Sequence, residues 1–226
     1  MEIFSSIQGE GQYIGKRQIF IRFAGCNINC KYCDTTTSKN KNSGKKYTHE
    51  QLNDKIQSLM TDDFHSLEIT GGEPLLHTQY ISEFLEKYPY RAMLETNATI
   101  PGNMRKLTRL IDIVSMDIKL PEHFETLPEW EDVYEKELET IDVLEESDTE
   151  YYIKIVVSPT TPIDVIDKIT GELENKISPA REVIVQPVSP TEKWTDKDNL
   201  FKISQTIGKN FNVSIIPQIH KYMNVE

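Results

Sequence analysis

The stretch "RQIFIRFAGCNINCKYCD", residues 17–34, links the main strand signal of this chain to its most reactive loop. Its first seven residues alternate and include β-branched and aromatic side chains, which predicts a β-strand over Arg17–Phe23. The strand runs into a loop that holds Cys26, Cys30 and Cys33, all the cysteines of the chain. A reactive loop at the end of a strand is typical of α/β folds that place their chemistry at one face of the sheet.

Strands and helices alternate along the rest of the chain. Thr48, followed by Gln51 three residues later, predicts a helix that starts with a capping box. About six strand–helix pairs imply a parallel sheet with right-handed crossovers. We therefore expect an α/β fold, a partial (β/α)6 TIM-like barrel, with a flat doubly wound sheet as the alternative. The predicted strands are 17–23, 66–70, 91–96, 112–119, 151–157, 181–188 and 211–217; the predicted helices lie at 48–60, 79–87, 104–110, within 121–150, after Thr161-Pro162 and at 196–207.

The composition is that of an ordinary globular protein and predicts a single domain over residues 1–226. Hydrophobic residues make up 38% of the chain and charged residues 27%, with a formal net charge of -11. Residues 121–150 contain thirteen acidic residues and one basic residue, so this segment alone explains the charge and is expected to be a solvated helix. No basic stripe predicts nucleic-acid binding, and no apolar run predicts a membrane span or a signal peptide. A cytoplasmic location is expected.

Polar and flexible segments follow nearly every predicted strand. Because the carboxyl ends of parallel strands meet at one face of a barrel, these segments predict a site there. The segments are the cysteine loop, "TGGEP" at 70–74, "ETN" at 95–97, "SMDIK" at 115–119, "QP" at 186–187 and "PQIHK" at 217–221.

Clustered thiols are compatible with several kinds of site, and their number discriminates among them. A disulfide framework needs an even number of cysteines and an oxidising compartment. Structural zinc takes four ligands, and no histidine stands at a suitable spacing. Buried apolar thiols would be scattered along the chain. Three thiolates suit a 4Fe-4S cluster in which three irons have protein ligands and the fourth iron is open to a small molecule.

The spacing C-x3-C-x2-C, with an aromatic residue before the last cysteine, resembles the radical S-adenosylmethionine (SAM) superfamily. The resemblance implies that the open iron chelates the amino and carboxylate groups of SAM. It also implies that the "GGE" segment at 71–73 contacts the methionine end of SAM, since glycines permit close backbone approach and an acid accepts from an ammonium group. The match at 115–119 is looser and leaves open which polar residue touches SAM. The residues implied for SAM binding are Tyr32, Asp34, Gly72, Glu73, Ser115, Asp117, Lys119 and Gln186.

The two ends of the chain are similar to the 7-carboxy-7-deazaguanine synthase family. That family has a "QGEG" segment, a strand ending in R-x-x-GC, "CDT" or "CDS" after the cysteines, and a closing Q-x-HK; this chain has all four. The resemblance implies conversion of 6-carboxy-5,6,7,8-tetrahydropterin into 7-carboxy-7-deazaguanine with loss of ammonia, a step toward queuosine and archaeosine. It is weakest across residues 121–150, which look like a lineage-specific insertion.

The same resemblance implies a pterin site and a Mg2+ site. A glutamine offers a donor and acceptor pair to the amide edge of a pterin, and an arginine can bind a carboxylate through two parallel hydrogen bonds. The bland alternatives are a polar turn for "QGEG" and an exposed strand residue for Arg22. The Thr35 hydroxyl is implied as a Mg2+ ligand, because this hard cation favours oxygen. His220 and Lys221 are expected at the mouth of the barrel. The residues implied for the substrate are Ile7, Gln8, Gly9, Glu10, Arg22 and Thr70.

Two other functions share part of this pattern. A radical SAM activase for a glycyl-radical partner protein would have the same cysteine spacing and "GGE" segment, without a need for "QGEG". A non-catalytic iron-sulfur carrier would generally close its cluster with four cysteines. The synthase resemblance further implies an electron donor such as flavodoxin or ferredoxin, and a homodimer.

Overall fold

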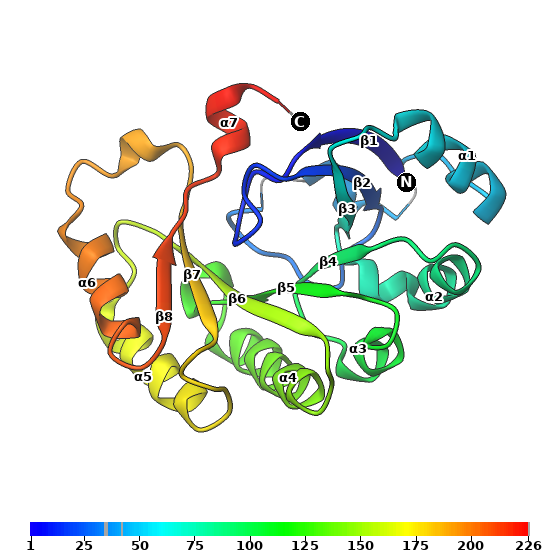
Figure 1. The fold of residues 1–226 in the computed structure, drawn as a ribbon. Helices are drawn as coiled ribbons and strands as arrows, with labels where there is room; N and C mark the ends of the chain where they lie inside the picture. Colours follow the sequence, from blue (N-terminus) through cyan, green and yellow to red (C-terminus); the bar gives the residue numbers. More distant parts are fainter. Residues whose placement is uncertain (34–35, 42, 226) are drawn as a thin grey trace.

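The computed structural model describes residues 1–33, 36–41 and 43–225. These residues form one curved sheet of eight strands, with helices along its outer face (Figure 1). The strands are β1 (Glu2–Ile7), β2 (Arg17–Phe23), β3 (Phe64–Gly71), β4 (Ala92–Thr96), β5 (Ile113–Ile118), β6 (Glu150–Val157), β7 (Glu182–Pro187) and β8 (Asn212–Ile215). The helices are α1 (His49–Leu59), α2 (Thr78–Lys87), α3 (Pro101–Leu107), α4 (Leu127–Glu145), α5 (Ile163–Glu174), α6 (Asp198–Ile207) and α7 (Ile219–Met223). Four short 3-10 helices are η1 (Thr36–Lys39), η2 (Pro74–His77), η3 (Pro121–His123) and η4 (Thr191–Lys193).

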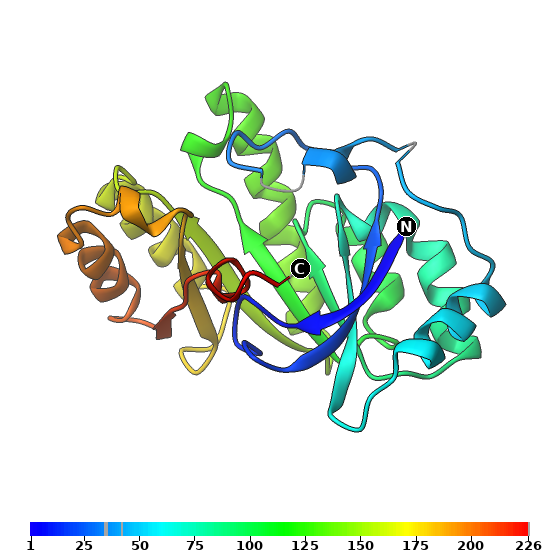
Figure 2. The same ribbon diagram turned by 90° about the horizontal axis from the view of Figure 1, so that it is seen from above.

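The strands follow one another in the sheet in the order of the sequence, from β1 to β8. Strands β2 to β8 are all parallel, and each of the helices α1 to α6 connects one of them to the next. The sheet curls inward between its two edges, so the alternative of a flat sheet is wrong (Figures 1 and 2). The expected partial (β/α)6 barrel is confirmed.

The sequence analysis missed two elements at the ends of the chain. Strand β1 pairs antiparallel with β2, with Glu2 opposite Arg22. Its sequence, EIFSSI, contains two serines and has no strong strand signal of its own, so the pairing with β2 defines it. Helix α7 is a short helix after β8. Both elements lie at the open side of the barrel, where the N- and C-terminal segments approach each other (Figure 2).

The predicted boundaries hold within a few residues, with two informative exceptions. The capping box at α1 is confirmed, since Thr48 and Gln51 exchange both hydrogen bonds. Helix α3 begins at Pro101 instead of residue 104, because proline fits the first turn of a helix. Helix α5 is not capped by the Thr161 side chain. The Thr161 hydroxyl instead donates to Glu122, at 2.7 Å, and accepts from the Ser158 amide.

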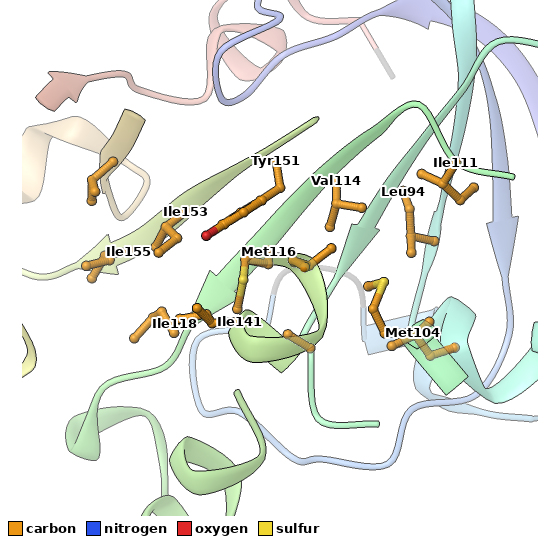
Figure 3. Close-up of a cluster of buried hydrophobic side chains, with 14 of the residues drawn as sticks. Leu94, Met104, Ile111, Val114, Met116, Ile118, Ile141, Tyr151, Ile153 and Ile155 are labelled. Carbon is orange, nitrogen blue, oxygen red and sulfur yellow. The ribbon is translucent and has the colours of Figure 1, made fainter. Parts of the chain in front are cut away.

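The main core lies between the sheet and its outer helices. Figure 3 shows side chains of β4, β5 and β6 that meet Met104 of α3 and Ile141 of α4. These side chains are fully or almost fully buried. The helices therefore fix the outside of the sheet and leave the opposite face of each strand to line the barrel interior.

The acidic segment forms the crossover between β5 and β6. One face of α4 is buried and includes Trp130, whose indole donates to the Lys119 carbonyl oxygen at 2.8 Å. Glu137 on the same face is fully buried, and its two carboxylate oxygens share a bifurcated hydrogen bond from the Lys119 amide, at 3.2 and 3.1 Å. The expected helix is confirmed, but it helps to hold the end of β5 and is not merely a solvated surface segment. That the segment is a lineage-specific insertion stays a prediction.

The C-terminal segment crosses the open side of the barrel and contacts the loop after β1. The Ile219 amide donates to the Gly9 carbonyl oxygen at 2.9 Å. This contact brings the two ends of the chain to one mouth. In the described part of the chain, none of the helices has the length and apolarity that crossing a membrane requires.

Candidate active site

A cavity of about 580 Å³ opens at the carboxyl ends of the parallel strands. It brings together fourteen of the residues predicted from sequence, although they come from most of the length of the chain. These residues are Ile7, Gln8, Gly9, Glu10, Arg22, Cys26, Cys30, Tyr32, Cys33, Thr70, Gly72, Asp117, Lys119 and Gln186. The predicted cap residues His220 and Lys221 also line it. Asp34 and Thr35 lie outside the described residues, and Glu73 and Ser115 do not line the cavity.

The cysteine loop is held against the "GGE" segment by backbone contacts. Gly25 has a φ of +100° and donates its amide to the Ser38 carbonyl oxygen at 2.6 Å. A Cβ atom on Gly72 would lie 2.2 Å from the Gly25 carbonyl oxygen, so only glycine fits there. The Glu73 amide donates to the same oxygen at 2.8 Å. The "GGE" segment therefore also holds the cysteine loop in position.

The three thiols fit an iron-sulfur cluster in number, chemistry and position. All three are free and partly buried at one end of the cavity. Burial raises the pKa of the Cys30 thiol to about 11, so metal binding must displace the proton. Among the described residues, no three His, Cys, Asp or Glu side chains converge as ligands of a single ion. The Asn97 amide lies beside this end, with Nδ2 at 3.8 Å from Cys26 Sγ.

The Glu73 carboxylate, which was predicted to bind SAM, points into the protein. Its side chain is fully buried and accepts from the Leu75 amide, the Asn97 amide and the Thr96 hydroxyl at 2.7–2.9 Å. These donors occupy both oxygens and fix the turn into η2. The Glu73 side chain therefore has a structural role and does not line the cavity, and a contact of Glu73 with SAM stays a prediction.

Of the three polar residues in the "SMDIK" segment, two line the cavity and one does not. Asp117 and Lys119 line the cavity and form an ion pair at 2.5 Å. The Lys119 ammonium also donates to the Tyr32 hydroxyl at 2.8 Å, which ties the end of β5 to the cysteine loop. Ser115 is buried two residues before Asp117 on the same strand and does not line the cavity, so a contact of Ser115 with the cofactor stays a prediction.

Lys154 of β6 is the centre of the ionic groups in the cavity. Its ammonium lies 2.8 Å from Glu10, 2.5 Å from Glu95 and 3.4 Å from Asp117. Burial alone would lower the pKa of Lys154, but the three carboxylates outweigh burial and raise it well above its ordinary value. Burial raises the pKa of Glu95 despite the contact with Lys154. The Lys154 ammonium therefore places one fixed positive charge among three carboxylates.

Glu10 receives hydrogen bonds from three elements that are remote in sequence. Besides Lys154, the Gln186 amide donates to it at 3.0 Å and the Gln218 amide at 2.6 Å. The Gln8 side chain accepts from the Glu10 amide at 3.1 Å and thereby fixes the loop. "QGEG" is thus an ordered wall of the cavity, and the interpretation as an ordinary polar turn is wrong.

The two remaining side chains predicted for the substrate lie at the cavity wall with partners of their own. Arg22 pairs with Glu2 at 2.8 Å and lies over the ring of Phe4, while its side chain remains partly exposed. The Thr70 hydroxyl donates to Glu95 at 3.1 Å. Both can exchange a protein partner for a ligand group without a backbone change.

Close packing explains why Gly9 stands in this wall. A Cβ atom at Gly9 would lie 2.2 Å from His220 Nδ1. The C-terminal segment therefore packs directly against the loop after β1. His220, which contacts Gly9, also lines the cavity.

Sequence reasoning missed Lys154, Glu95, Asn97 and Gln218. Lys154 and Glu95 stand inside otherwise apolar strands, "YYIKIVV" and "AMLET". A charged residue in a strand buried on both faces needs a partner inside, and this signal could have identified both. Asn97 and Gln218 were part of quoted strand-end segments, but nothing local distinguished them.

A partial barrel with a three-cysteine loop and a polar cavity at its carboxyl face defines a radical SAM enzyme. A family profile described as "4Fe-4S single cluster domain" matches residues 7–119. The crystal structure of QueE from Escherichia coli shares the fold, with a TM-score of 0.58 and 24% identity, over 95% of this chain and 91% of that chain. The structure of native anSMEcpe with bound AdoMet also shares it, with a TM-score of 0.58 and 16% identity, over 86% of this chain and 63% of that chain.

Full-length relatives identify the family more closely. A 7-carboxy-7-deazaguanine synthase of Methanothermobacter thermautotrophicus is 41% identical, over 100% of this chain and 96% of the relative. One of Methanocaldococcus jannaschii is 36% identical, over 99% of this chain and 98% of the relative. The chain belongs to the 7-carboxy-7-deazaguanine synthase family, as the sequence motifs predicted.

Proposed function

We propose that this enzyme is a radical SAM lyase that contracts the ring of 6-carboxy-5,6,7,8-tetrahydropterin to give 7-carboxy-7-deazaguanine and ammonia. Family membership over the whole chain supports this function. The single structural observation that supports it best is the joint cavity, which the cysteine loop and the "QGEG" loop line together. A radical formed at one end can thus meet a substrate held at the other, which is the proximity that such chemistry needs.

The cluster end is formed by Cys26, Cys30 and Cys33, which would bind three irons of a 4Fe-4S cluster. When bound, the cluster supplies the electron that cleaves SAM to a 5′-deoxyadenosyl radical. Gly72, Asp117 and Lys119 would surround SAM. Because Lys119 pairs with both Asp117 and Tyr32, this wall is held rigid before SAM arrives.

The substrate end offers groups that match the edges of a pterin. The Glu10 carboxylate can accept from the guanidine-like edge, and Gln8 with Gln186 can pair with the amide edge. Arg22 can bind the substrate carboxylate in two parallel hydrogen bonds once it leaves Glu2. Lys154 would hold the Glu10 carboxylate in place, since its ammonium is already paired there.

Four finer features extend this proposal. Thr35 would provide an oxygen ligand to Mg2+, which in turn would bind the substrate carboxylate. Flavodoxin or ferredoxin would supply the electron. The enzyme would act in the cytoplasm and as a homodimer. These features follow from the family resemblance and the motif "CDT" at 33–35.

An anaerobic assay of the reconstituted enzyme tests the function directly. With dithionite, SAM and the carboxy-tetrahydropterin, we expect equal amounts of ammonia and 7-carboxy-7-deazaguanine, with Mg2+ increasing the rate. Formation of 5′-deoxyadenosine without either product would point to another substrate and contradict the proposal. A Thr35→Ala variant should respond less to Mg2+ and still cleave SAM, and an unchanged magnesium titration would exclude Thr35 as a ligand.

A further inference from the structure

The cysteine loop lies between two surfaces of opposite charge. Residues 31–46 contain five lysines and one acidic residue in a chain whose net charge is -11. We call Lys31, Lys39, Lys41, Lys45 and Lys46 the lysine patch. All five are exposed or half-buried. Such a concentration of one charge beside a redox centre is unusual for an acidic protein and needs a physical explanation.

Contacts place two lysines of the patch, Lys39 and Lys41, against the cluster-binding loop. The Lys39 ammonium lies 3.3 Å from the Cys30 carbonyl oxygen. The Lys41 side chain packs over Gly25, the neighbour of Cys26, with its Cγ 3.0 Å from the position of a Cβ there. In the described part of the chain, the acid paired with the patch is Glu125, at 3.5 Å from Lys31. Lys31 and Lys39 also line the cavity, whereas Lys41, Lys45 and Lys46 are exposed outside it.

The other side of the cysteine loop is acidic. A second cavity of about 320 Å³ is lined by Cys26 and Asn27 and, from α4, by two acids, Glu129 and Asp132, and one lysine, Lys136, which pairs with Asp132 at 2.6 Å. The loop is joined to the segment before this helix, where the Lys31 amide donates to the His123 carbonyl oxygen at 3.0 Å. An approaching acidic protein is thus attracted on one side of the loop and repelled on the other, which fixes its orientation.

We propose that the lysine patch is the docking surface for an acidic one-electron carrier protein that reduces the cluster. The proposal rests on the proposed function, which requires one electron for each cleavage of SAM. In the transfer, the carrier is oxidised by one electron and the 4Fe-4S cluster is reduced by one. Docking on Lys41, which packs over Gly25 beside Cys26, brings the carrier against the cysteine loop, and Lys41, Lys45 and Lys46 do not line the cavity that SAM and substrate would occupy.

The test compares two charge-reversed variants of the cluster-loaded enzyme. Lys41→Glu/Lys46→Glu changes the patch without touching cavity residues. Lys202→Glu/Lys209→Glu makes the same change in charge on and after α6, on the outside of the barrel. Flavodoxin hydroquinone and dithionite are mixed with each protein in a stopped-flow instrument, and cluster bleaching is followed at several salt concentrations. Binding of oxidised flavodoxin is measured separately.

We expect the patch variant to lose at least about 10-fold in the second-order rate with flavodoxin, and to lose most of the dependence of that rate on salt. Its rate with dithionite and its cluster potential should match those of the control. Equal flavodoxin rates in the two variants would overturn the proposal. A parallel loss with both reductants, together with a shifted potential, would also overturn it, since the lysines would then tune the cluster. Failure of the proposed function appears separately, as absence of product with dithionite in the unmodified enzyme.

Discussion

The ammonium group of Lys154 lies 2.8 Å from the carboxylate of Glu10, a residue 144 positions earlier in the chain. This contact joins the sixth strand of the barrel to the loop after the first. The Lys154 side chain is 4% exposed, so its charge is almost removed from water. Such a pair is stable only where further hydrogen bonds satisfy it, as Gln186 and Gln218 do for Glu10.

Replacement of the central lysine should affect both stability and substrate use. Lys154→Met leaves Glu10, Glu95 and Asp117 without their shared cation, which costs about 3–5 kcal/mol when a buried pair is broken on one side. We expect kcat/KM for the pterin to fall about 100-fold or more. Ammonia release and urea unfolding measure the two effects. Lys168→Met, at an exposed position of α5, is the control, and near-normal turnover of Lys154→Met would show that the cavity does not need this charge.

Loss of one thiol should remove the cluster without unfolding the protein. Cys30→Ala deletes one of three iron ligands, so we expect negligible product and a large loss of bound iron per chain. Asn29→Ala is the matched control, because Asn29 stands next to Cys30 and its side chain accepts a hydrogen bond from Lys39 at 2.7 Å. Iron analysis and visible absorbance after anaerobic reconstitution are the readouts. Retention of iron and turnover by Cys30→Ala would exclude Cys30 as a ligand.

The contact between Gly9 and His220 predicts a rescue experiment. Gly9→Ala would place a Cβ atom 2.2 Å from His220 Nδ1, so the C-terminal segment must move away from the mouth. Overpacking of this kind typically costs about 1–3 kcal/mol, and we expect the KM for the pterin to rise as well.

The double variant Gly9→Ala/His220→Gly removes the clash, since the three clashing atoms all belong to the His220 side chain, its Cβ included, and it should recover most of the lost stability. Thermal unfolding of both single variants and the double variant forms the cycle. Additive losses in the double variant would mean that the two residues do not interact in solution.

Glu68, which lies fully buried on β3, predicts a pH effect on stability. Burial, reinforced by the nearby Glu95 carboxylate, raises the pKa of Glu68 well above its ordinary value of 4.5. Above pH 4.5 the unfolded chain releases this proton and the folded chain keeps it. Folding stability therefore decreases as pH rises, by up to about 1.4 kcal/mol per pH unit from this group alone.

Glu68→Gln removes this proton linkage and keeps the shape of the side chain. We expect the variant to match the unmodified enzyme near pH 4.5 and to become the more stable of the two toward pH 7. Urea unfolding at several pH values, on the cluster-free protein, measures the difference. A constant difference across this range would mean that Glu68 is ionised in the folded protein.

Local patterns in the sequence were sufficient for most elements and for the cluster. The capping box at Thr48 and Gln51 depends on residues three positions apart, and the strand signal of Arg17–Phe23 depends on neighbours. The same is true of the three cysteines. Strand β1 was missed because its state depends on pairing with β2, which no local pattern contains.

Side-chain direction at the site was decided by tertiary contacts. Glu73 is part of a predicted binding motif, yet backbone donors of two other segments turn it inward. Ser115 and Asp117 belong to one sequence motif on β5. Only Asp117, which lies two residues closer to the carboxyl end of the strand, lines the cavity. Lys154 was left out of the predicted site because its neighbours in the strand do not show which face of the sheet it occupies.

By itself, therefore, the sequence determined the kind of cofactor, the alternation of strands and helices, and the face of the barrel that holds the site, because each depends on residues close together in the chain. Only the tertiary structure decided which charged groups share the cavity. The partners of Lys154 lie 144 and 59 positions away, and curvature of the sheet is what brings them within hydrogen-bonding distance.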